Sequence, residues 1–485
     1  MPNGTLSMMS RSRAKDFVAG QAVHAMLDLV SAARAIGARH RGGNATFDRV
    51  TTDSRDLRPG DLFVGIRGDR FDGQSFADQA LLAGAAGVMV QPGAEILTAD
   101  ARVLEVDDTR LALGRLAAFW RARFASPLIA ITGSNGKTTV KEMLASILRQ
   151  VAGESGVLAT VGNLNNDIGM PITLLRLNAQ HRYAVIEMGM NHLGEISYLS
   201  SLAKPTIALI NNAGTAHIGE LGSVEAIARA KGEIFEGLDE NGIAILNADD
   251  AFADYWRGRL QGQRVVDFGL DKRAAVTARY ELSVLGSLVT FLTPRGEFVA
   301  TLGVPGLHNI KNALAAVSCA YALEIPSAAI VAGLAAYAGV KGRLQRKRHR
   351  SGALVIDDTY NANPDSMQAA IAVLAAYPGH RFFVMGDMGE LGGDAEALHA
   401  SIGAYAKRSG VHAMFAMGES SAAAVRSFGE GASHFSSVDD LVGALSGCLE
   451  RGSTVLVKGS RFMRMERVVE ALGAVNGESA MKGVA

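Results

Sequence analysis

The chain has 485 residues, of which 48% are apolar and 20% are charged, and its formal net charge at pH 7 is zero. This length exceeds what one hydrophobic core usually spans, so we expect several domains, and the apolar content excludes a chain that is disordered by composition. The balanced charge gives no electrostatic reason to bind nucleic acid or an anionic membrane, and it therefore favours a small-molecule partner.

The first 24 residues carry basic side chains but lack the unbroken apolar core of a secretory signal, so we interpret residues 1–24 as an extension. No apolar run in the sequence approaches the roughly 18 residues of a membrane-spanning helix, and we therefore expect a cytoplasmic protein without membrane insertion. The two cysteines, Cys319 and Cys448, lie far apart and lack the spacing of metal ligands. We expect both to be buried free thiols.

The expected elements fall into three blocks. Residues 25–107 begin with the helical pattern MLDLVSAARAIGA and continue into a turn-rich segment, which predicts a small α/β domain. Residues 108–342 alternate strands and helices, starting with LIAIT and KTTVKEMLASIL, and this order implies a parallel sheet. Within this block, residues 277–303 are expected to form antiparallel strands, followed by the helix GLHNIKNALAAVSCAYAL. Residues 343–485 alternate again, with ALVIDD, RFFVMGD, VHAMFAMG and STVLVKG as strands of a Rossmann-like sheet.

A basic segment, KGRLQRKRHR, separates the second block from the third and holds six Lys or Arg residues in ten. Aromatic residues are not interleaved with these charges, and the net charge of the chain is zero. The segment is therefore interpreted as a solvated hinge hairpin rather than as a nucleic-acid site.

The stretch ITGSNGKTTVKEML follows an expected strand and opens an expected helix. A full P-loop reads G-x-x-x-x-G-K-[ST], but Ile131 stands five residues before Gly136, where the first glycine would be, so the backbone at Ile131 must stay extended. The glycine turn can still present N–H groups to phosphates at the helix N-terminus, with Lys137 reaching the outer phosphates and Thr138 binding Mg²⁺. We therefore predict an ATP site formed by Gly133, Ser134, Asn135, Gly136, Lys137, Thr138 and Thr139.

Polar residues after other strands of this block are candidate metal ligands. Glu187 ends the strand YAVIE, at the carboxyl edge where parallel sheets bind ligands, and a carboxylate there suits Mg²⁺. His192 and His217 lie in loops after strands, and each can be a ligand or an ordinary loop histidine.

A series of motifs resembles the Mur ligase family in both content and order, from about Met26 to about Glu466. The motifs are TDSRDLRPGDLFVGIRG, TGSNGKTTVKEM, GNLNNDIGMPITLL, EMGMNHLGEI, AHIGELGSVEAIARAKGEIF, GLHNIKNALAA, IDDTYNANPDSM, MGDMGELG and VLVKGSRFMRME. The departures are Thr359, where the family often has serine, and residues 1–24, which match nothing. The resemblance implies three domains, with a substrate domain, a central P-loop ATPase domain and a Rossmann-like domain.

The resemblance also implies the reaction. It indicates an ATP- and Mg²⁺-dependent ligase that joins D-alanyl-D-alanine to the terminal carboxylate of a UDP-N-acetylmuramoyl-tripeptide, through an acyl phosphate, during peptidoglycan precursor synthesis. We expect such an enzyme to be a monomer.

The resemblance assigns roles in the reaction centre to several residues. Lys137 would hold the β- and γ-phosphates, and Arg343 would reach the γ-phosphate from an interdomain hinge. The metal sites would use Thr138, Glu187, His217 and Lys231, the last as a carbamate. Asn309 and Asn312 would contact the adenine region, with helix capping as the alternative, and Asp358 would bind the ribose hydroxyls.

Further residues would bind the other substrates. The uridine nucleotide would contact Ser54, Arg55, Asp72 and Gly73, for which a polar turn is the alternative. The muramoyl peptide would contact Asn165, Asn166 and Asp167. The cleft would be lined from the third domain by Tyr360, Asn361 and Asn363, and Lys458 would help dock the dipeptide.

Two other functions stay open from the sequence. The first is a different ligase of this family, either one that adds the third amino acid or a folylpolyglutamate synthase, although the loop DDTYNANP and the N-terminal domain argue against these. The second is a P-loop ATPase that switches or moves a partner. Such an ATPase would turn over ATP without an amino-acid acceptor.

Overall fold

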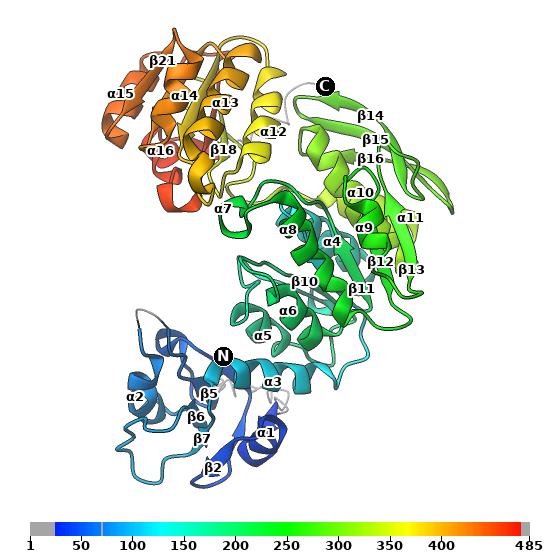
Figure 1. Ribbon diagram of the computed structural model, residues 1–485, viewed down its shortest axis with the longest axis vertical. Helices are drawn as coiled ribbons and strands as arrows, with labels where there is room; N and C mark the ends of the chain where they lie inside the picture. The colour runs from blue at the N-terminus through cyan, green and yellow to red at the C-terminus, as the bar shows by residue number, and fades with distance from the viewer. Residues whose placement is uncertain (1–24, 69–70, 477–485) are drawn as a thin grey trace, which may run out of the picture. The chain divides into compact units, whose positions relative to one another are not determined.

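The computed structural model describes residues 25–68 and 71–476 (Figure 1). The chain divides into two compact units, Met1–Ala112 and Leu113–Ala485. Within the described residues, five sheets and the helices that accompany them confirm the expected α/β fold class. The expected extension, residues 1–24, lies outside the described residues.

The first unit is built on a five-stranded sheet with the order β2-β7-β6-β5-β4, in which all pairs except β2 with β7 are parallel. These strands are β2 (Arg39–Arg41), β4 (Arg49–Thr51), β5 (Asp61–Val64), β6 (Gly87–Val90) and β7 (Val103–Glu105). Two short strands, β1 (Leu27–Asp28) and β3 (Thr46–Phe47), pair antiparallel beside them. The unit also holds helix α2 (Ala77–Leu82) and the 3₁₀ turns η1 (Ser54–Asp56) and η2 (Gly73–Phe76).

The first helix, α1 (Leu29–Ile36), is shorter than the helical pattern in the sequence. It begins where the Asp28 side chain accepts a hydrogen bond from the Ser31 N–H, and it ends at Gly37, whose φ of 72° closes the last turn. Its inward face buries Leu29 and Ile36, so the amphipathic pattern is used as expected over these eight residues.

The boundary between the units falls inside α3 (Thr109–Arg121), because the second unit begins at Leu113. The second unit contains a six-stranded parallel sheet with the order β13-β12-β11-β8-β10-β9. Its strands are β8 (Leu128–Thr132), β9 (Val157–Ala159), β10 (Tyr183–Glu187), β11 (Ile207–Ile210), β12 (Ile243–Asn247) and β13 (Arg264–Phe268). The shorter helices that connect them are α5 (Gly169–Leu174), α6 (Glu195–Ala203), α7 (Ile218–Leu221), α8 (Val224–Gly232) and α9 (Ala253–Arg257). The helical segment after Ser223 ends as a 3₁₀ turn, η4 (Glu233–Gly237).

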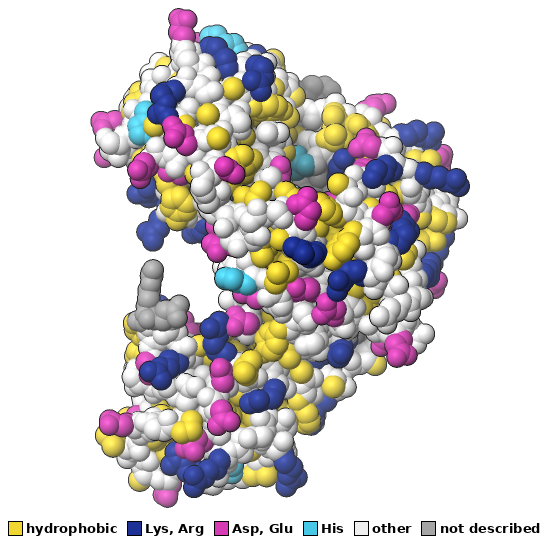
Figure 2. Space-filling model, viewed as in Figure 1, with side chains coloured by type: hydrophobic (Ala, Val, Ile, Leu, Met, Phe, Trp, Pro, Cys, Tyr) yellow, Lys and Arg dark blue, Asp and Glu magenta, His cyan; other side chains and the backbone are white. Residues whose placement is uncertain are grey.

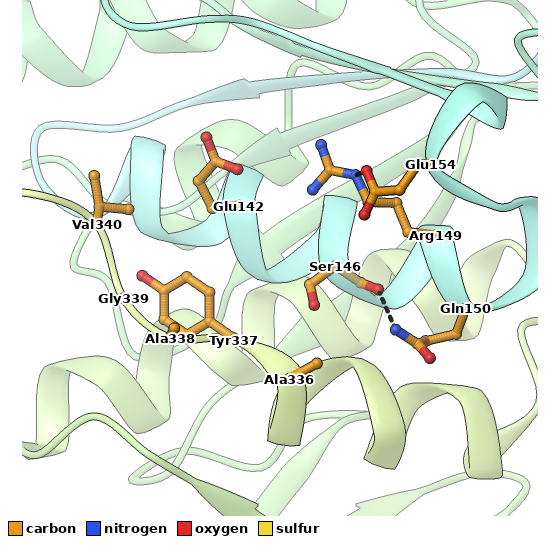
Figure 3. Close-up of a pocket in the computed structure, with 10 residues that line it drawn as sticks. All are labelled: Glu142, Ser146, Arg149, Gln150, Glu154, Ala336, Tyr337, Ala338, Gly339 and Val340. Atoms are coloured by element: carbon orange, nitrogen blue, oxygen red, sulfur yellow. Dashed lines mark hydrogen bonds and ion pairs between the residues drawn. The ribbon is translucent and has the colours of Figure 1, made fainter. Parts of the chain in front are cut away.

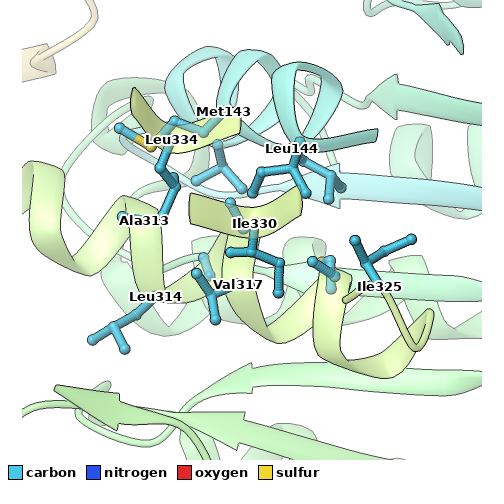
Figure 4. Close-up of a cluster of buried hydrophobic side chains, with 14 of the residues drawn as sticks. Met143, Leu144, Ala313, Leu314, Val317, Ile325, Ile330 and Leu334 are labelled. Atoms are coloured by element: carbon cyan, nitrogen blue, oxygen red, sulfur yellow. The ribbon is translucent and has the colours of Figure 1, made fainter. Parts of the chain in front are cut away.

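Three longer helices, α4 (Lys137–Ala152), α10 (Leu307–Ala322) and α11 (Ser327–Ala336), enclose the core of this region. Figure 4 shows Met143 and Leu144 of α4 facing Ala313 and Val317 of α10 and Leu334 of α11. All five of these side chains are buried, and burying a leucine- or methionine-sized side chain stabilises a fold by about 1.5–3 kcal/mol. This packing fixes the helix that starts at the P-loop.

The expected antiparallel strands are confirmed as a three-stranded sheet, β14 (Thr277–Ser283), β15 (Gly286–Thr293) and β16 (Gly296–Leu302). We refer to residues 128–336 as the central region.

The remaining strands form a seven-stranded sheet with the order β21-β20-β19-β22-β18-β17-β23, which we call the C-terminal sheet. They are β17 (Gln345–Arg348), β18 (Leu354–Asp358), β19 (Arg381–Gly386), β20 (Ala413–Met417), β21 (Ala432–Phe435), β22 (Thr454–Lys458) and β23 (Val475–Asn476). Its helices are α12 (Pro364–Ala375), α13 (Ala395–Arg408), α14 (Ser421–Phe428), α15 (Val438–Ser446) and α16 (Glu466–Ala471). The strands from β18 to β21 are parallel, and β17 forms the expected hairpin with β18.

The two cysteines differ in exposure. Cys319 is buried in α10 as expected, but the expectation of a buried thiol is wrong for Cys448, which is exposed. Cys448 lies in a surface turn after α15, and the sequence gives no signal that separates this exposed position from a buried one.

The visible surface mixes acidic and basic side chains, in keeping with the zero net charge (Figure 2). Among the residues that the structure describes, no helix is both long and apolar enough to cross a bilayer.

Candidate active site

The phosphate-binding turn connects β8 to α4. Ile131 lies inside the buried strand, so the backbone is extended where the full P-loop pattern has its first glycine. Gly136 has a φ of 82°, and a Cβ atom there would lie 2.1 Å from the Asn312 Oδ1 atom. Glycine is therefore required at this position by both conformation and space. The first N–H groups of α4 have no partner within the helix and are available to an anion.

Two asparagines that follow strand β11 hold this turn. The Asn212 carbonyl oxygen accepts from the Ser134 N–H at 3.0 Å, and the Asn212 Oδ1 atom accepts from the Asn135 N–H at 2.9 Å. The Asn211 side-chain amide donates to the Asn135 carbonyl at 2.9 Å and to the Asn312 Oδ1 atom at 3.0 Å. The shape of the turn thus depends on the neighbouring strand.

Lys137 lies at the first position of α4. Its Nζ atom donates to the Gly133 carbonyl at 2.7 Å, so the side chain folds back across the turn. Burial lowers the pKa of Lys137, and the carboxylate of Glu187 opposes this shift. The position agrees with a side chain that contacts phosphates bound in the turn.

Thr138, Glu187, Asn165 and Arg343 converge beside the turn. The Thr138 hydroxyl donates to Glu187 Oε2 at 2.9 Å and accepts from Arg343 Nη2 at 3.1 Å. The Asn165 amide donates to Glu187 Oε1 at 2.8 Å. Glu187 is only 2% exposed, so these hydrogen bonds hold its carboxylate in one orientation. The structure therefore brings together four residues that the sequence analysis singled out.

This cluster fits Mg²⁺ held jointly with a nucleotide. A hydroxyl and a carboxylate offer hard oxygen ligands, and Mg²⁺ at phosphate sites usually takes its other ligands from phosphates and water. Within residues 25–68 and 71–476, no group of three or more His, Cys, Asp or Glu side chains could hold a metal by itself.

Lys231 lies near the end of α8 and is 1% exposed. Burial lowers its pKa well below the ordinary value, and the positive charge of Lys137 acts in the same direction. The environment therefore favours the neutral amine, which is the form that can react with CO₂.

His217 has a φ of 65° and precedes α7. Its Nδ1 atom lies 2.7 Å from Oε2 of Glu390, and this contact lowers the pKa of Glu390. The resemblance to the family implies that His217 is a metal ligand, whereas the sequence gives no signal for Glu390.

The two asparagines of α10 do not cap that helix, because its N-cap is Gly306 and no side chain caps it there. Asn309 donates to the Pro305 carbonyl at 2.8 Å, and Asn312 lies beneath Gly136. The capping alternative is thus excluded, and Asn312 supports the P-loop directly.

Two charged residues of the C-terminal sheet neutralise each other. Asp358 Oδ2 lies 2.7 Å from Lys458 Nζ, and Asp358 Oδ1 accepts from the Leu344 N–H at 3.1 Å. The Lys458 ammonium also donates to the Asn361 carbonyl at 2.8 Å. His308, for which the sequence gives no signal, lies near both charges. Burial lowers the pKa of His308 to about 4, while the charges of Asp358 and Lys458 act on it in opposite directions.

Two further candidates, Tyr360 and Asn363, follow strand β18. The centre of the Tyr360 ring lies 4.3 Å from the guanidinium carbon of Arg343. The Asn363 amide donates to Asn135 Oδ1 at 2.9 Å, while its own oxygen accepts from the Ser366 N–H and caps α12. Tyr360 and Asn363 therefore lie beside the phosphate-binding turn and the arginine.

In the first unit, the four candidates follow β4 and β5 at the carboxyl edge of the parallel strands. Arg55 pairs with Asp53 at 2.7 Å and is largely exposed, next to Ser54. Asp72 caps the turn η2, and the Gly73 N–H donates to the Ile66 carbonyl at 2.9 Å. The polar-turn alternative describes the local structure of these residues, and the edge they occupy is where parallel sheets bind ligands.

Three segments of the chain match the domains of one family. Residues 131–320 match the Mur ligase middle domain, residues 342–461 the Mur ligase glutamate ligase domain, and residues 46–121 the Mur ligase family catalytic domain. The chain is also 44% identical over 436 residues to the UDP-N-acetylmuramoyl-tripeptide–D-alanyl-D-alanine ligase of Escherichia coli strain K12, covering 89% of this chain and 95% of the relative. The chain belongs to the Mur ligase family.

Solved structures agree with this assignment. Crystal structure I of MurF from Acinetobacter baumannii is 37% identical, with a TM-score of 0.86, and the match covers 91% of this chain and 98% of that one. The MurF ligase from Thermotoga maritima, solved in complex with ADP, is 28% identical, with a TM-score of 0.78, and the match covers 87% and 96% of the two chains.

In this Mur ligase, the two other residues expected to contact the muramoyl peptide are Asn166 and Asp167. The Asn166 side chain accepts from the Gly169 N–H at 2.9 Å and so holds the start of α5. Asp167 lies in the same loop, between β9 and α5.

A cavity of about 370 Å³ lies between α4 and the segment Ala336–Val340 (Figure 3). It is lined further by Glu142, Ser146, Arg149, Gln150 and Glu154, and none of the predicted site residues is among its lining. The candidate site at the phosphate-binding turn therefore does not include this cavity.

Proposed function

We propose that this Mur ligase joins D-alanyl-D-alanine to the terminal carboxylate of a UDP-N-acetylmuramoyl-tripeptide, with conversion of ATP to ADP and phosphate. The observation that carries the proposal is the 44% identity, over 89% of this chain, to a ligase with that name. It is supported by the ADP complex of a related MurF and by the convergence of Lys137, Thr138, Glu187 and Arg343 at one turn.

The chemistry must activate a carboxylate, which is a poor electrophile. An oxygen of the tripeptide carboxylate attacks the γ-phosphorus, the bond from this phosphorus to the β–γ bridging oxygen breaks, and ADP leaves. The dipeptide amine then attacks the acyl carbon, the bond from this carbon to the phosphate oxygen breaks, and the nitrogen loses a proton. The products are the amide and inorganic phosphate.

The main electrostatic obstacle is the repulsion between a carboxylate and a triphosphate. Lys137 lies across the phosphate-binding turn, and Arg343 lies beside Thr138, so both cations are placed to offset the negative charge of the γ-phosphoryl group. Mg²⁺ held by Thr138 and Glu187 would supply further neutralisation. The buried position of Glu187 keeps its charge directed at this centre.

We also propose a carbamate on Lys231. The neutral amine nitrogen attacks CO₂, a nitrogen–carbon bond forms as one carbon–oxygen π bond opens, and one proton leaves, which converts a neutral side chain into an anionic oxygen ligand. The burial of Lys231 and its proximity to Lys137 favour this form because a second buried ammonium would be repelled. The carbamate would hold a second Mg²⁺, with His217 contributing to the metal sites.

Each of the three parts of the chain would bind a different substrate. Residues 25–107 would bind the uridine nucleotide through Ser54, Arg55, Asp72 and Gly73. Residues 108–342 would bind ATP, with Asn309 and Asn312 near the adenine, and the muramoyl peptide through Asn165, Asn166 and Asp167. Asp358, from residues 343–485, would bind the ribose hydroxyls. Residues 343–485 would deliver the dipeptide along Tyr360, Asn361, Asn363 and Lys458. Because the substrates are ATP and a uridine nucleotide, the cytoplasm is the expected location, and we expect a monomer.

The function is tested by incubating the protein with ATP, Mg²⁺, D-alanyl-D-alanine and UDP-N-acetylmuramoyl-tripeptides that end in meso-diaminopimelate or L-lysine. The expected result is a pentapeptide product by mass spectrometry, with phosphate release that requires the dipeptide. Phosphate release without any acceptor would instead indicate an ATPase switch. Product from a UDP-muramoyl-dipeptide and a single amino acid would indicate a ligase that adds the third residue.

A further inference from the structure

Residues 213–219 follow β11 and run into the first turn of α7, and we call this segment the loop. It is held at its start by other residues of the central region. The Ala213 N–H donates to Asp250 Oδ2 at 2.9 Å, and the Gly214 N–H donates to the Ser134 hydroxyl at 2.9 Å. Ser134 is part of the phosphate-binding turn, so a shift of this loop would also displace a residue of that turn.

The rest of the loop contacts residues of the C-terminal sheet. Asp365 Oδ2 accepts from the Thr215 N–H at 2.8 Å and from the Thr215 hydroxyl at 3.0 Å. The Gly219 N–H donates to the Glu390 carbonyl at 2.8 Å, and Ile218 packs against the hydrophobic core under α12 and α13. The loop therefore lies between the P-loop and the C-terminal sheet and contacts both.

The Asp365 carboxylate lies against the backbone at Gly214. A Cβ atom on Gly214 would lie 2.4 Å from Asp365 Oδ2, so a side chain at position 214 would displace the carboxylate. Asp365 belongs to the first turn of α12, where the helix dipole favours a negative charge. Two residues before it, Asn363 donates to Asn135 in the phosphate-binding turn. The start of α12 thus contacts the turn directly and also through the loop.

We propose that Asp365 is a positioning residue that couples the C-terminal sheet to the phosphate-binding turn by holding Thr215. This inference rests on the proposed function, in which the dipeptide amine must reach an acyl carbon beside that turn. Small displacements of reacting groups reduce rates strongly, so a loosened loop lowers the rate of the amide-forming step. His217 follows Thr215 by two residues, so its position depends on the same loop.

The test compares Asp365→Ala, Asp365→Asn and the control Glu396→Ala in the full-length protein. Glu396 is also an exposed carboxylate at the start of a helix, α13, but it pairs with Arg426 of the neighbouring helix α14. The readouts are amide hydrogen exchange without substrates, the unfolding midpoint, and kcat and KM for pentapeptide synthesis.

In Asp365→Ala, amide exchange over residues 213–219 should accelerate about tenfold, kcat should fall about tenfold, and KM for ATP should stay within about twofold of the wild-type value. Asp365→Asn should keep most of the activity because its amide oxygen can accept both hydrogen bonds. Glu396→Ala should match the wild type in exchange over this loop and in kcat.

Unchanged exchange over residues 213–219 in Asp365→Ala would overturn the proposal, as would an unchanged kcat or an equal loss in Glu396→Ala. A fall in the unfolding midpoint that accounts for the lost activity would also overturn it, because the role would then be structural. If the wild type makes no pentapeptide, the proposed function fails, while hydrogen exchange still tests the contact by itself.

Discussion

The Thr138 hydroxyl donates to the Glu187 carboxylate at 2.9 Å, which joins the first turn of α4 to the end of β10. The two residues are 49 positions apart, and they meet because β8 and β10 are parallel neighbours. Both strands end at the same edge of the sheet, so the helix that follows one strand lies beside the last residue of the other.

Replacing Glu187 by Gln should raise the Mg²⁺ concentration required for half-maximal activity by at least about tenfold, because a neutral amide binds a hard cation more weakly than a carboxylate does. The measurement is a magnesium titration of pentapeptide synthesis. Glu240→Gln, which changes an exposed glutamate in a turn, is the control and should leave the titration unchanged. An unaltered magnesium requirement in Glu187→Gln would remove Glu187 from the metal site.

Lys137→Ala should lower kcat by at least about a hundredfold while leaving the unfolding midpoint near the wild-type value. The side chain contacts the Gly133 carbonyl and contributes positive charge, whereas the apolar packing of α4 comes from other residues. Activity is followed by product mass and folding by thermal denaturation. Lys407→Ala, on α13, is the matched control. Retention of most activity in Lys137→Ala would contradict the ATP assignment.

Lys231→Ala should lose nearly all activity and recover part of it when short carboxylic acids are added, because these can supply the anionic oxygens of the missing carbamate. Carbon-13 NMR with labelled bicarbonate should show a carbamate signal in the wild type that is absent from the variant. A near-normal rate in Lys231→Ala, or no such signal in the wild type, would mean that the second metal has other ligands.

Acidification should destabilise the protein partly through His308. Burial lowers the pKa of His308 to about 4 from an ordinary value of 6.5. As the pH falls from 6.5 to 4, the unfolded chain binds a proton at this residue that the folded protein does not, so the free energy of unfolding decreases. The stabilising contribution is present above pH 6.5 and is lost towards pH 4.

Urea unfolding of the wild type and His308→Gln at several pH values between 7 and 4 measures this effect. The variant should show a shallower decrease in the free energy of unfolding over this window because it lacks the titrating group. Circular dichroism at pH 7 verifies that the variant is folded. Parallel pH profiles for the two proteins would show that His308 does not contribute.

The sequence by itself determined the local framework of the site. The strand LIAIT, the glycine turn and the helix after Lys137 are consecutive, so hydrophobic pattern and glycine placement were enough to predict them. The position of Glu187 followed because it ends an apolar strand. The sequence does not predict strands such as β9 and β12, because short apolar runs are weak signals without their neighbours.

Only the tertiary structure decided which distant residues complete the site. Asn135 and Asn363 are 228 positions apart, and Thr215 and Asp365 are 150 apart, so neither spacing nor composition indicates that they touch. Asn211 and Asn212 hold the P-loop because β11 lies directly beside β8 in the sheet. Strand order and the contacts between the start of α12 and the loops of the central region place these side chains. Both depend on contacts along the whole chain rather than on local pattern.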